Sequence, residues 1–388
     1  MLPAAASYDL VIVGASFAGL VAARTAAMRG LKVAVLDGKH GAGHRVATTG
    51  ILVKEAVEEI DIPHALTRRV YGVRLYAPNL KHVDLFAPGY FFLTTDTANL
   101  LRWLAEEAQR AGAHLLWKTR FEGAAREGDV FRLSNLNVCA RYILGADGSR
   151  SAVARHFGLG RNSRFLTGVE YEYEGLPDID QRFLHCFLNS DIAPGYLAWV
   201  APAPTVVQAG LAVGPGRRPD VGKFLNATDR IFQFGKARLV GRRAGRIPCG
   251  GLVRPWAKDG VMLVGDAAGM VSPATGGGIR LAFHFGRRAG QAIADHLLHM
   301  GPAPDVALAP ELPSFLLKRA MRFGLDQQVP NSLISAALGI SAMRTFAQQV
   351  FFHKRGAQGV TFSEFEEGLA RLSTSIASGT GAAVSQEK

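Results

Sequence analysis

Residues 8–19 read YDLVIVGASFAG, and this stretch decides the fold of the chain. Its first half, residues 8–13, is short, apolar and rich in β-branched side chains, which is typical of a buried strand in a parallel sheet. Residues 20–29 are rich in alanine and predict a helix that ends at Gly30. Residues 31–36 read LKVAVL and predict the next strand. The order of strand, turn, helix and strand predicts a βαβ unit.

The turn between the first strand and the helix has the composition of a diphosphate site. Gly14 permits a tight turn, and Gly19 lets the helix pack closely on the strand. The helix N-terminus then presents N–H groups and a positive dipole end to a diphosphate. Ser16 replaces the usual middle glycine, and it is small enough to permit close approach. Asp37 ends the second strand about 20 residues later, where a carboxylate can accept hydrogen bonds from ribose hydroxyls.

Two further motifs follow apolar strands. Residues 145–151 read GADGSRS, and residues 265–279 read GDAAGMVSPATGGGI. Ligands of α/β sheets bind at the carboxyl ends of strands, where Asp147 and Asp266 can accept hydrogen bonds from ligand hydroxyls. Residues 276–278 are glycines that open a helix. They can bring N–H groups towards a ligand ring and stabilise negative charge on it. The three motifs together predict a dinucleotide site at one sheet edge.

The motifs resemble those of FAD-dependent oxidoreductases of the p-hydroxybenzoate hydroxylase superfamily, and within it those of the geranylgeranyl reductase family most. The resemblance covers about residues 8–297. It implies that FAD is the cofactor, and that the turn and Asp37 hold its ADP half. It also implies Asp266 for the ribityl chain and residues 276–279 for the isoalloxazine side. The residues that we expect at FAD are Gly14, Ser16, Phe17, Ala18, Gly19, Asp37, Arg45, Asp147, Gly265, Asp266, Gly276, Gly277, Gly278 and Ile279.

The expected fold is α/β, with a discontinuous Rossmann-like FAD-binding domain, a β-sheet substrate domain and a helical C-terminal extension. Short alternating strands interrupt the Rossmann-like pieces, and a polar tail of small residues ends the chain. The expected boundaries are 1–66, 96–162 and 247–300 for the FAD-binding domain, 67–95 and 163–246 for the substrate domain, 301–372 for the helical extension and 373–388 for a disordered tail.

The sequence departs from the family pattern at three places. Thr97 stands where much of the superfamily has an arginine that touches FAD. Residues 44–50 read HRVATTG and lack the cysteine of many family members, which excludes a redox-active thiol there. Residues 196–202 match the family's aromatic substrate element only in part. We take Thr49, Tyr196 and Trp199 as candidate substrate residues.

Individual residues in these segments keep alternative interpretations. Arg45 is either a diphosphate or substrate contact or a surface arginine. Thr48 and Thr49 either line the flavin edge or cap a helix from Ile51 onward, and we favour capping. The two aromatic candidates either wall a substrate cavity or belong to the core. No residue is identifiable as catalytic, and no metal-binding constellation is visible.

The composition of the chain narrows the classes of partner that the protein is expected to bind. The formal net charge is +12 and several basic clusters occur, which favours a solvated basic face, an anionic membrane surface or a phosphorylated ligand. Nucleic acid is disfavoured because no nucleic-acid motif accompanies the charge. The three cysteines form no CxxC pair, which fits a reducing compartment. No signal peptide or membrane-spanning run is visible. We therefore expect a cytoplasmic protein with peripheral contact to the inner membrane face.

The leading functional hypothesis is reduction of carbon–carbon double bonds in an isoprenoid or other apolar substrate by hydride transfer from reduced FAD. The first alternative is an FAD-dependent monooxygenase that hydroxylates an aromatic or polyketide-like compound, because the same fold serves it. The second is a non-redox flavoprotein cyclase. NAD(P)H is the candidate electron donor, although the sequence holds no second full dinucleotide fingerprint.

Overall fold

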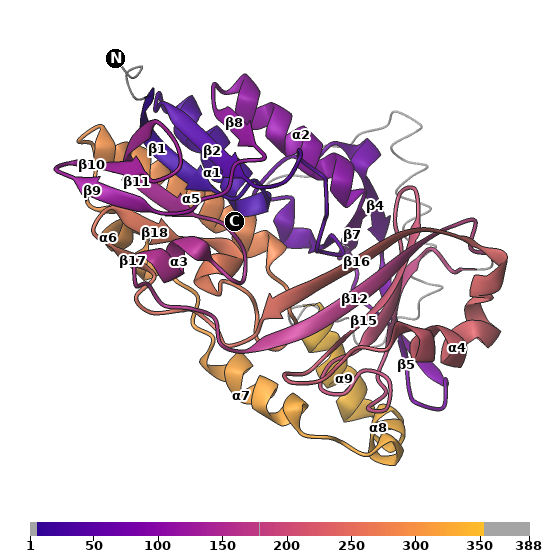
Figure 1. Ribbon diagram of the computed structural model, residues 1–388. Coiled ribbons are helices and arrows are strands. Elements are labelled where there is room, and N and C mark those ends of the chain that lie inside the picture. Colours follow the sequence, from indigo (N-terminus) through magenta and orange to yellow (C-terminus); the bar gives the residue numbers. More distant parts are fainter. Residues whose placement is uncertain (1–5, 178, 353–388) are drawn as a thin grey trace, which may run out of the picture.

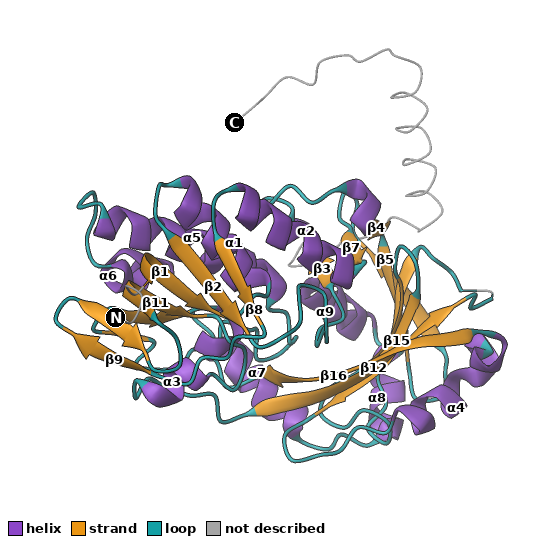
Figure 2. Cartoon of the chain, turned by 45° about the horizontal axis from the view of Figure 1, so that its top comes forward, coloured by secondary structure: helices purple, strands orange, loops and turns teal. Residues whose placement is uncertain are grey.

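The computed structural model describes residues 6–177 and 179–352, and it places them in two lobes that lie side by side (Figure 2). One lobe is built on an eight-stranded sheet with helices on one face, and the other on a seven-stranded sheet. This arrangement confirms the expected α/β fold with a Rossmann-like unit and a separate β-sheet. The expected tail of residues 373–388 lies outside the described residues.

The first sheet has the strand order β17-β18-β11-β1-β2-β8, with β10 paired to β11 and β9 paired to β10. Its parallel core joins segments that are far apart in sequence, because β1 pairs with both β2 and β11, and β11 pairs with β18 (Figure 1). The strands are β1 Ala6–Val13, β2 Val33–Asp37, β8 His114–Trp117, β9 Ala124–Glu127, β10 Val130–Leu133, β11 Val138–Gly145, β17 Ala257–Lys258 and β18 Val261–Leu263.

Three helices cover one face of this sheet: α1 Phe17–Met28, α2 Thr97–Arg110 and α5 Ile279–Leu297. Helices α1 and α5 touch through glycines. A Cβ atom on Gly286 would lie 2.6 Å from the carbonyl oxygen of Ala18, and one on Gly290 would lie 2.5 Å from that of Ala22. These distances leave no room for a side chain. Helix α5 begins at Ile279, so the three glycines before it form a loop rather than a helical turn.

The second sheet has the order β16-β12-β15-β14-β13-β5-β6. Its strands are β5 Gly72–Tyr76, β6 His82–Phe86, β12 Phe165–Glu174, β13 Phe183–Phe187, β14 Ala198–Pro202, β15 Val207–Val213 and β16 Arg238–Pro248. Helix α4, Val221–Phe232, packs on it through the buried side chains of Phe224 and Phe232. Strand β16 continues to Pro248, two residues past the domain boundary that the sequence suggested.

A small third sheet joins β3 Ile51–Val53, β7 Phe92–Thr95 and β4 Thr67–Val70. Residues 67–95 are therefore shared between two sheets. The prediction that Thr48 and Thr49 cap a helix from Ile51 onward is wrong, because residues 51–53 pair with β7 as a strand. Gly50 precedes that strand with φ +81°, a conformation that favours glycine.

The remaining helices are α3 Ala152–His156, α6 Pro304–Leu308, α7 Leu316–Asp326, α8 Asn331–Leu338 and α9 Ser341–Phe351. Helices α7, α8 and α9 confirm a helical C-terminal extension up to residue 352, and residues 353–372 of the expected extension lie outside the described residues. Arg322 is 2% exposed, pairs with Asp326 and donates to the carbonyl oxygen of Gly195, which fastens α7 to the second lobe. Within residues 6–177 and 179–352, no helix combines the length and apolarity needed to cross a bilayer.

Candidate functional site

The turn between β1 and α1 is packed too tightly for any residue but glycine at two positions. Gly14 has φ +107°, and a Cβ atom there would lie 2.3 Å from the carbonyl oxygen of Ala146. A Cβ atom on Gly19 would lie 1.9 Å from the carbonyl oxygen of Gly14. Ser16 is the N-cap of α1 but makes no capping hydrogen bond, so the first-turn N–H groups lack a side-chain partner there. This is the geometry that a diphosphate requires at a helix N-terminus.

The other predicted members of this turn contribute backbone rather than side chains. The ring of Phe17 is buried and packs edge-to-face on Phe283 at 5.4 Å between centroids. Ala18 faces Gly265, whose φ is +59° and whose Cβ would lie 3.0 Å from that of the alanine. The third motif therefore meets the first turn of α1, as the expected site requires.

Asp37 holds the end of β2 against the glycine turn. Its Oδ2 accepts from the backbone N–H of Ala15 at 2.8 Å, and its Oδ1 accepts from that of Lys39 at 2.8 Å. Each carboxylate oxygen has a second lone pair, so the side chain can still accept from a ribose hydroxyl.

Asp147 and Asp266 both present carboxyl oxygens that lack partners. Oδ2 of Asp147 accepts from the backbone N–H groups of Ala152 and Val153, at 2.6 and 3.2 Å, while Oδ1 is buried without a hydrogen bond. Among the described residues no group donates to the carboxyl of Asp266, and burial raises its pKa to about 6. A buried oxygen without a donor, such as Oδ1 of Asp147, is costly, and the hydroxyls of a polyol chain could donate to both carboxyl groups.

Asn162, which sequence reasoning missed, joins the two motifs. Its Nδ2 donates to the carbonyl oxygens of Ser149 at 3.2 Å and Asp266 at 2.8 Å. It stands outside every glycine pattern, so no local signal marked it.

The loop of residues 276–278 lies against the second lobe. Gly276 has φ +64°, and its Cβ position is 2.9 Å from the hydroxyl of Tyr196. That hydroxyl donates to the carbonyl oxygen of Thr275, and burial raises its pKa. A Cβ on Gly278 would lie 3.5 Å from Oδ1 of Asp266, while Gly277 donates weakly to Thr275 at 3.4 Å. The predicted substrate tyrosine thus touches the predicted flavin loop.

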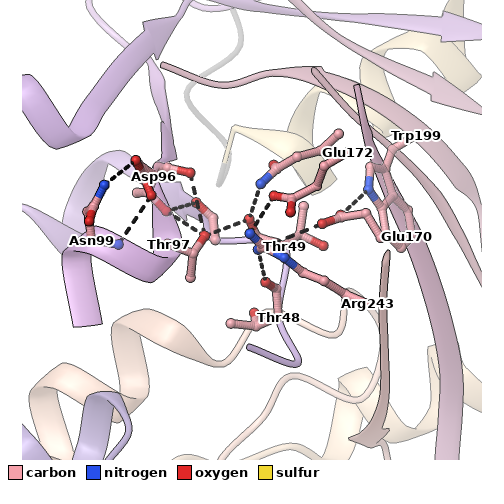
Figure 3. Close-up of polar contacts among 12 residues, drawn as sticks. Thr48, Thr49, Asp96, Thr97, Asn99, Glu170, Glu172, Trp199 and Arg243 are labelled. Atoms are coloured by element: carbon pink, nitrogen blue, oxygen red, sulfur yellow. Dashed lines mark hydrogen bonds and ion pairs between the residues drawn. The ribbon is translucent and has the colours of Figure 1, made fainter. Parts of the chain in front are cut away.

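The loop of residues 44–50 is fastened at its carbonyl groups (Figure 3). The carbonyl oxygen of Thr49 accepts from Oγ1 of Thr97 at 3.0 Å and from Nε2 of Gln208 at 2.9 Å, and that of Thr48 accepts from Nη1 of Arg243 at 2.9 Å. Thr97, in place of the family arginine, is thus a buried loop anchor. Arg45 is exposed, with φ +50°, and makes no hydrogen bond or ion pair within the described residues.

Trp199 is 9% exposed and donates from Nε1 to Oε2 of Glu170 at 2.9 Å. Glu170 is buried on β12, and burial raises its pKa to about 7. Sequence reasoning missed this residue, because a glutamate in the alternating run GVEYEYEG looks like any outward-facing strand residue.

A cavity of about 560 Å³ opens beside the second motif. Its lining includes four arginines, namely Arg150, Arg155, Arg161 and Arg246, and no acidic side chain. Within the described residues none of the four forms an ion pair, and the guanidinium of Arg246 lies over the ring of Phe165. A cavity with this lining favours an anion.

The comparisons with known proteins agree with this geometry. Residues 7–217 match the family described as FAD binding domain. The chain is 32% identical over 307 residues to digeranylgeranylglycerophospholipid reductase of Methanosarcina acetivorans, which covers 74% of each chain. It is 32% identical over 309 residues to the protein of that name from Methanothrix thermoacetophila, with 74% and 78% covered.

The fold is shared with solved structures. One is a geranylgeranyl bacteriochlorophyll reductase-like protein from Thermoplasma acidophilum, with TM-score 0.76 and 22% identity over 95% of this chain and 99% of the other. The glycine turn, the two aspartates and these relatives lead to one assignment. The chain belongs to the geranylgeranyl reductase family of FAD-dependent oxidoreductases.

Proposed function

We propose that this protein reduces carbon–carbon double bonds in an isoprenoid or similar apolar chain. Its curated relatives are named for the reduction of a digeranylgeranyl lipid. The observation that carries the proposal is the contact between the lobes at Tyr196, whose hydroxyl bonds the backbone of the predicted flavin loop at Thr275. The nearby Trp199 belongs to an apolar cluster that includes Val73, Leu75 and Tyr90. An apolar chain that packs there would lie close to the flavin.

The residues present fit FAD, because the first-turn N–H groups of α1 lack a side-chain cap and Oδ1 of Asp147 lacks a partner. Bound FAD would supply the hydride. We propose that the α1 N-terminus holds its diphosphate, that Asp37 holds its ribose, and that Asp147 and Asp266 accept from its polyol hydroxyls. Residues 276–279 would border the ring.

An anoxic single-turnover experiment tests this function. The flavoprotein is photoreduced, mixed with a digeranylgeranyl glycerophospholipid, and followed at the flavin absorption band and by mass spectrometry of the lipid. We expect the flavin to reoxidise without oxygen while the lipid gains two hydrogens per flavin. A lipid of unchanged mass, with a flavin that reoxidises only in air, would contradict the proposal. It would favour the monooxygenase, whereas an isomerised product of equal mass would favour the cyclase.

We propose NAD(P)H as the electron donor, with its phosphates in the four-arginine cavity. Guanidinium groups bind phosphate oxygens with two parallel hydrogen bonds, and the cavity lies beside Ser149 and Ala267 of the second and third motifs. A nucleotide anchored there would lie close to the proposed cofactor site.

We also propose that α7 rests on an anionic bilayer. Leu316 and Leu317 are each 75% exposed and Phe323 is 66% exposed, and the chain carries a net charge of +12. Apolar side chains on a basic protein are the combination that binds anionic lipid surfaces. Contact of α7 with a bilayer would also bring the protein to a lipid substrate.

Sedimentation with vesicles tests this contact. The protein should sediment with vesicles that contain phosphatidylglycerol, and the variant Leu316→Ser/Leu317→Ser should lose most of that binding. The control Val306→Ser changes another exposed apolar residue, which lies on α6 and is 60% exposed, and this variant should sediment as the wild type does. Equal sedimentation of all three proteins would exclude α7 as the contact.

A further inference from the structure

Glu170 lies one strand in from the edge of the second sheet, next to the strand β16 that meets the loop of residues 44–50. It sits on β12 between Gly210 of β15 and Arg243 of β16, and it is 3% exposed. The indole of Trp199 reaches it by crossing β15 at Gly210, where a Cβ atom would lie 2.9 Å from the indole carbon Cζ2. Only a glycine at this position lets the indole lie across the strand and donate to the carboxylate.

One arginine serves two carboxylates on this face. Nη2 of Arg243 pairs with Oε1 of Glu172, and its Nη1 lies 3.9 Å from Oε1 of Glu170. Oε1 of Glu170 is buried and makes no hydrogen bond. The same Nη1 donates to the carbonyl oxygen of Thr48. A continuous polar path therefore runs from Trp199 through Glu170 and Arg243 to the loop (Figure 3).

The two ends of this path lie at different parts of the proposed site. Trp199 is part of the apolar cluster of the second sheet. At the other end, Gly245 of β16 packs on the loop, since its Cβ position is 2.6 Å from the carbonyl oxygen of Ala47. Two residues further along the strand, Ile247 lies 3.5 Å from the Cβ position of Gly276. The loop and the predicted flavin segment thus lie side by side on one strand.

We propose that Glu170 is a positioning residue. It fixes the Trp199 indole directly and the loop of residues 44–50 through Arg243. The candidate substrate residue Trp199 and the flavin thereby keep one position relative to each other. The proposed role of Glu170 at the indole rests on the proposed function, whereas its proposed role at the loop depends only on flavin binding. A purely structural role would be met by a glutamine, whose carbonyl accepts the indole N–H without a buried charge. A glutamine would not supply the attraction of a carboxylate for Arg243, whose Nη1 lies 3.9 Å from Oε1 of Glu170.

The charge state of Glu170 changes near neutral pH, because burial and the neighbouring carboxylate of Glu172 raise its pKa to about 7. The groups that face it are Trp199 on β14, Arg243 on β16 and Thr49 on the loop, and the other charged group nearby is Glu172 on its own strand. Above that pKa the carboxylate attracts Arg243, and below it the attraction is lost. The bound flavin should therefore change its absorption or fluorescence as the pH crosses about 7.

The test compares Glu170→Gln with the wild type and with Glu174→Gln, which changes an exposed glutamate at the end of the same strand. The flavin spectrum of each holoprotein is titrated from pH 5.5 to 8.5, a range of about 1.5 units on either side of neutrality. We expect a transition near pH 7 in the wild type and in the control variant, and none in Glu170→Gln. Flavin spectra that titrate identically in all three proteins would overturn the proposal.

Two further measurements separate positioning from folding and from the proposed function. The folded state keeps the Glu170 proton to higher pH than the unfolded state, so stability falls as pH rises from about 4.5 to about 7. Glu170→Gln should lose that part of the fall but still unfold in one cooperative transition, and this transition shows that the variant folds. Glu170→Leu, which removes the indole acceptor, should raise KM for the lipid about 10- to 100-fold with a smaller change in kcat. An unchanged KM in an active, folded variant would overturn the indole role. If no lipid is reduced by the wild type while the flavin transition depends on Glu170, only the proposed substrate fails.

Discussion

Gly14→Ala is expected to leave a protein that no longer retains FAD. The residue has φ +107°, and an added Cβ would lie 2.3 Å from the carbonyl oxygen of Ala146 and 2.6 Å from its carbonyl carbon. Both are backbone atoms at the end of β11, so the turn itself must move. Overpacking of this kind costs about 1–3 kcal/mol, and the positive φ adds about 1 kcal/mol. The shift displaces the N–H groups that we propose for the diphosphate. The flavin-to-protein ratio of the purified variant measures the effect.

Gly30→Ala is the matched control for this change. Gly30 lies just past the other end of the same helix with φ +89°, and a Cβ there would meet nothing within 4 Å. The variant carries the same kind of backbone strain without the clash. It should keep its flavin and lose only about 1 kcal/mol of stability. Equal flavin loss in the two variants, or full flavin retention in Gly14→Ala, would show that close packing at the turn does not control binding.

Arg150→Ala/Arg155→Ala is expected to raise the KM for NAD(P)H by about 100-fold or more. Hydrogen bonds to charged groups contribute about 1.5–3 kcal/mol each, and two arginines would lose their phosphate contacts. Anoxic reduction of the flavin by NAD(P)H in a stopped-flow instrument gives the concentration dependence. The rate at which NAD(P)H reduces the wild-type flavin should also fall with added salt, because salt screens the attraction between the arginines and the negative phosphates.

Arg217→Ala/Arg218→Ala is the control for the cavity variant. This pair is exposed and forms no ion pair within the described residues, so it removes the same charge at another place. Its KM for NAD(P)H should stay within about twofold of the wild type, since distant exposed charges are screened by salt. If the cavity variant instead takes electrons normally but loses lipid turnover after photoreduction, the cavity serves a lipid phosphate and the donor proposal fails.

The local order of the cofactor half was predictable from sequence. The first strand, the glycine turn, the helix and the strand that ends at Asp37 all lie close to their predicted bounds, because each is specified by neighbouring residues. These features depend on backbone geometry and on the pattern of apolar residues, and a short stretch of sequence is enough to specify both.

The polar network of the second lobe was not predictable. Glu170, Gln208 and Arg243 meet only because the register of three strands places them on one face. Their separation in sequence carries no period or motif that could have marked them. The interpretation of Thr49 failed for a related reason, since the pairing of β3 with β7 is a tertiary event that outweighs a local capping pattern. Roles in flavin binding stay predictions for the residues of the three motifs.

The glycine contact between α1 and α5 has a consequence for how the chain matures. Helix α1 is synthesised well before its partner α5, which follows both β-rich segments in the chain. Until α5 is made, the face of α1 at Ala18 and Ala22 lacks its packing partner. The edge of β11 is likewise unpaired until β18 is made. Long-range pairing of this kind slows folding and leaves nascent chains prone to aggregation. The glycine turn before α1 therefore reaches its final packing only after α5 has been synthesised.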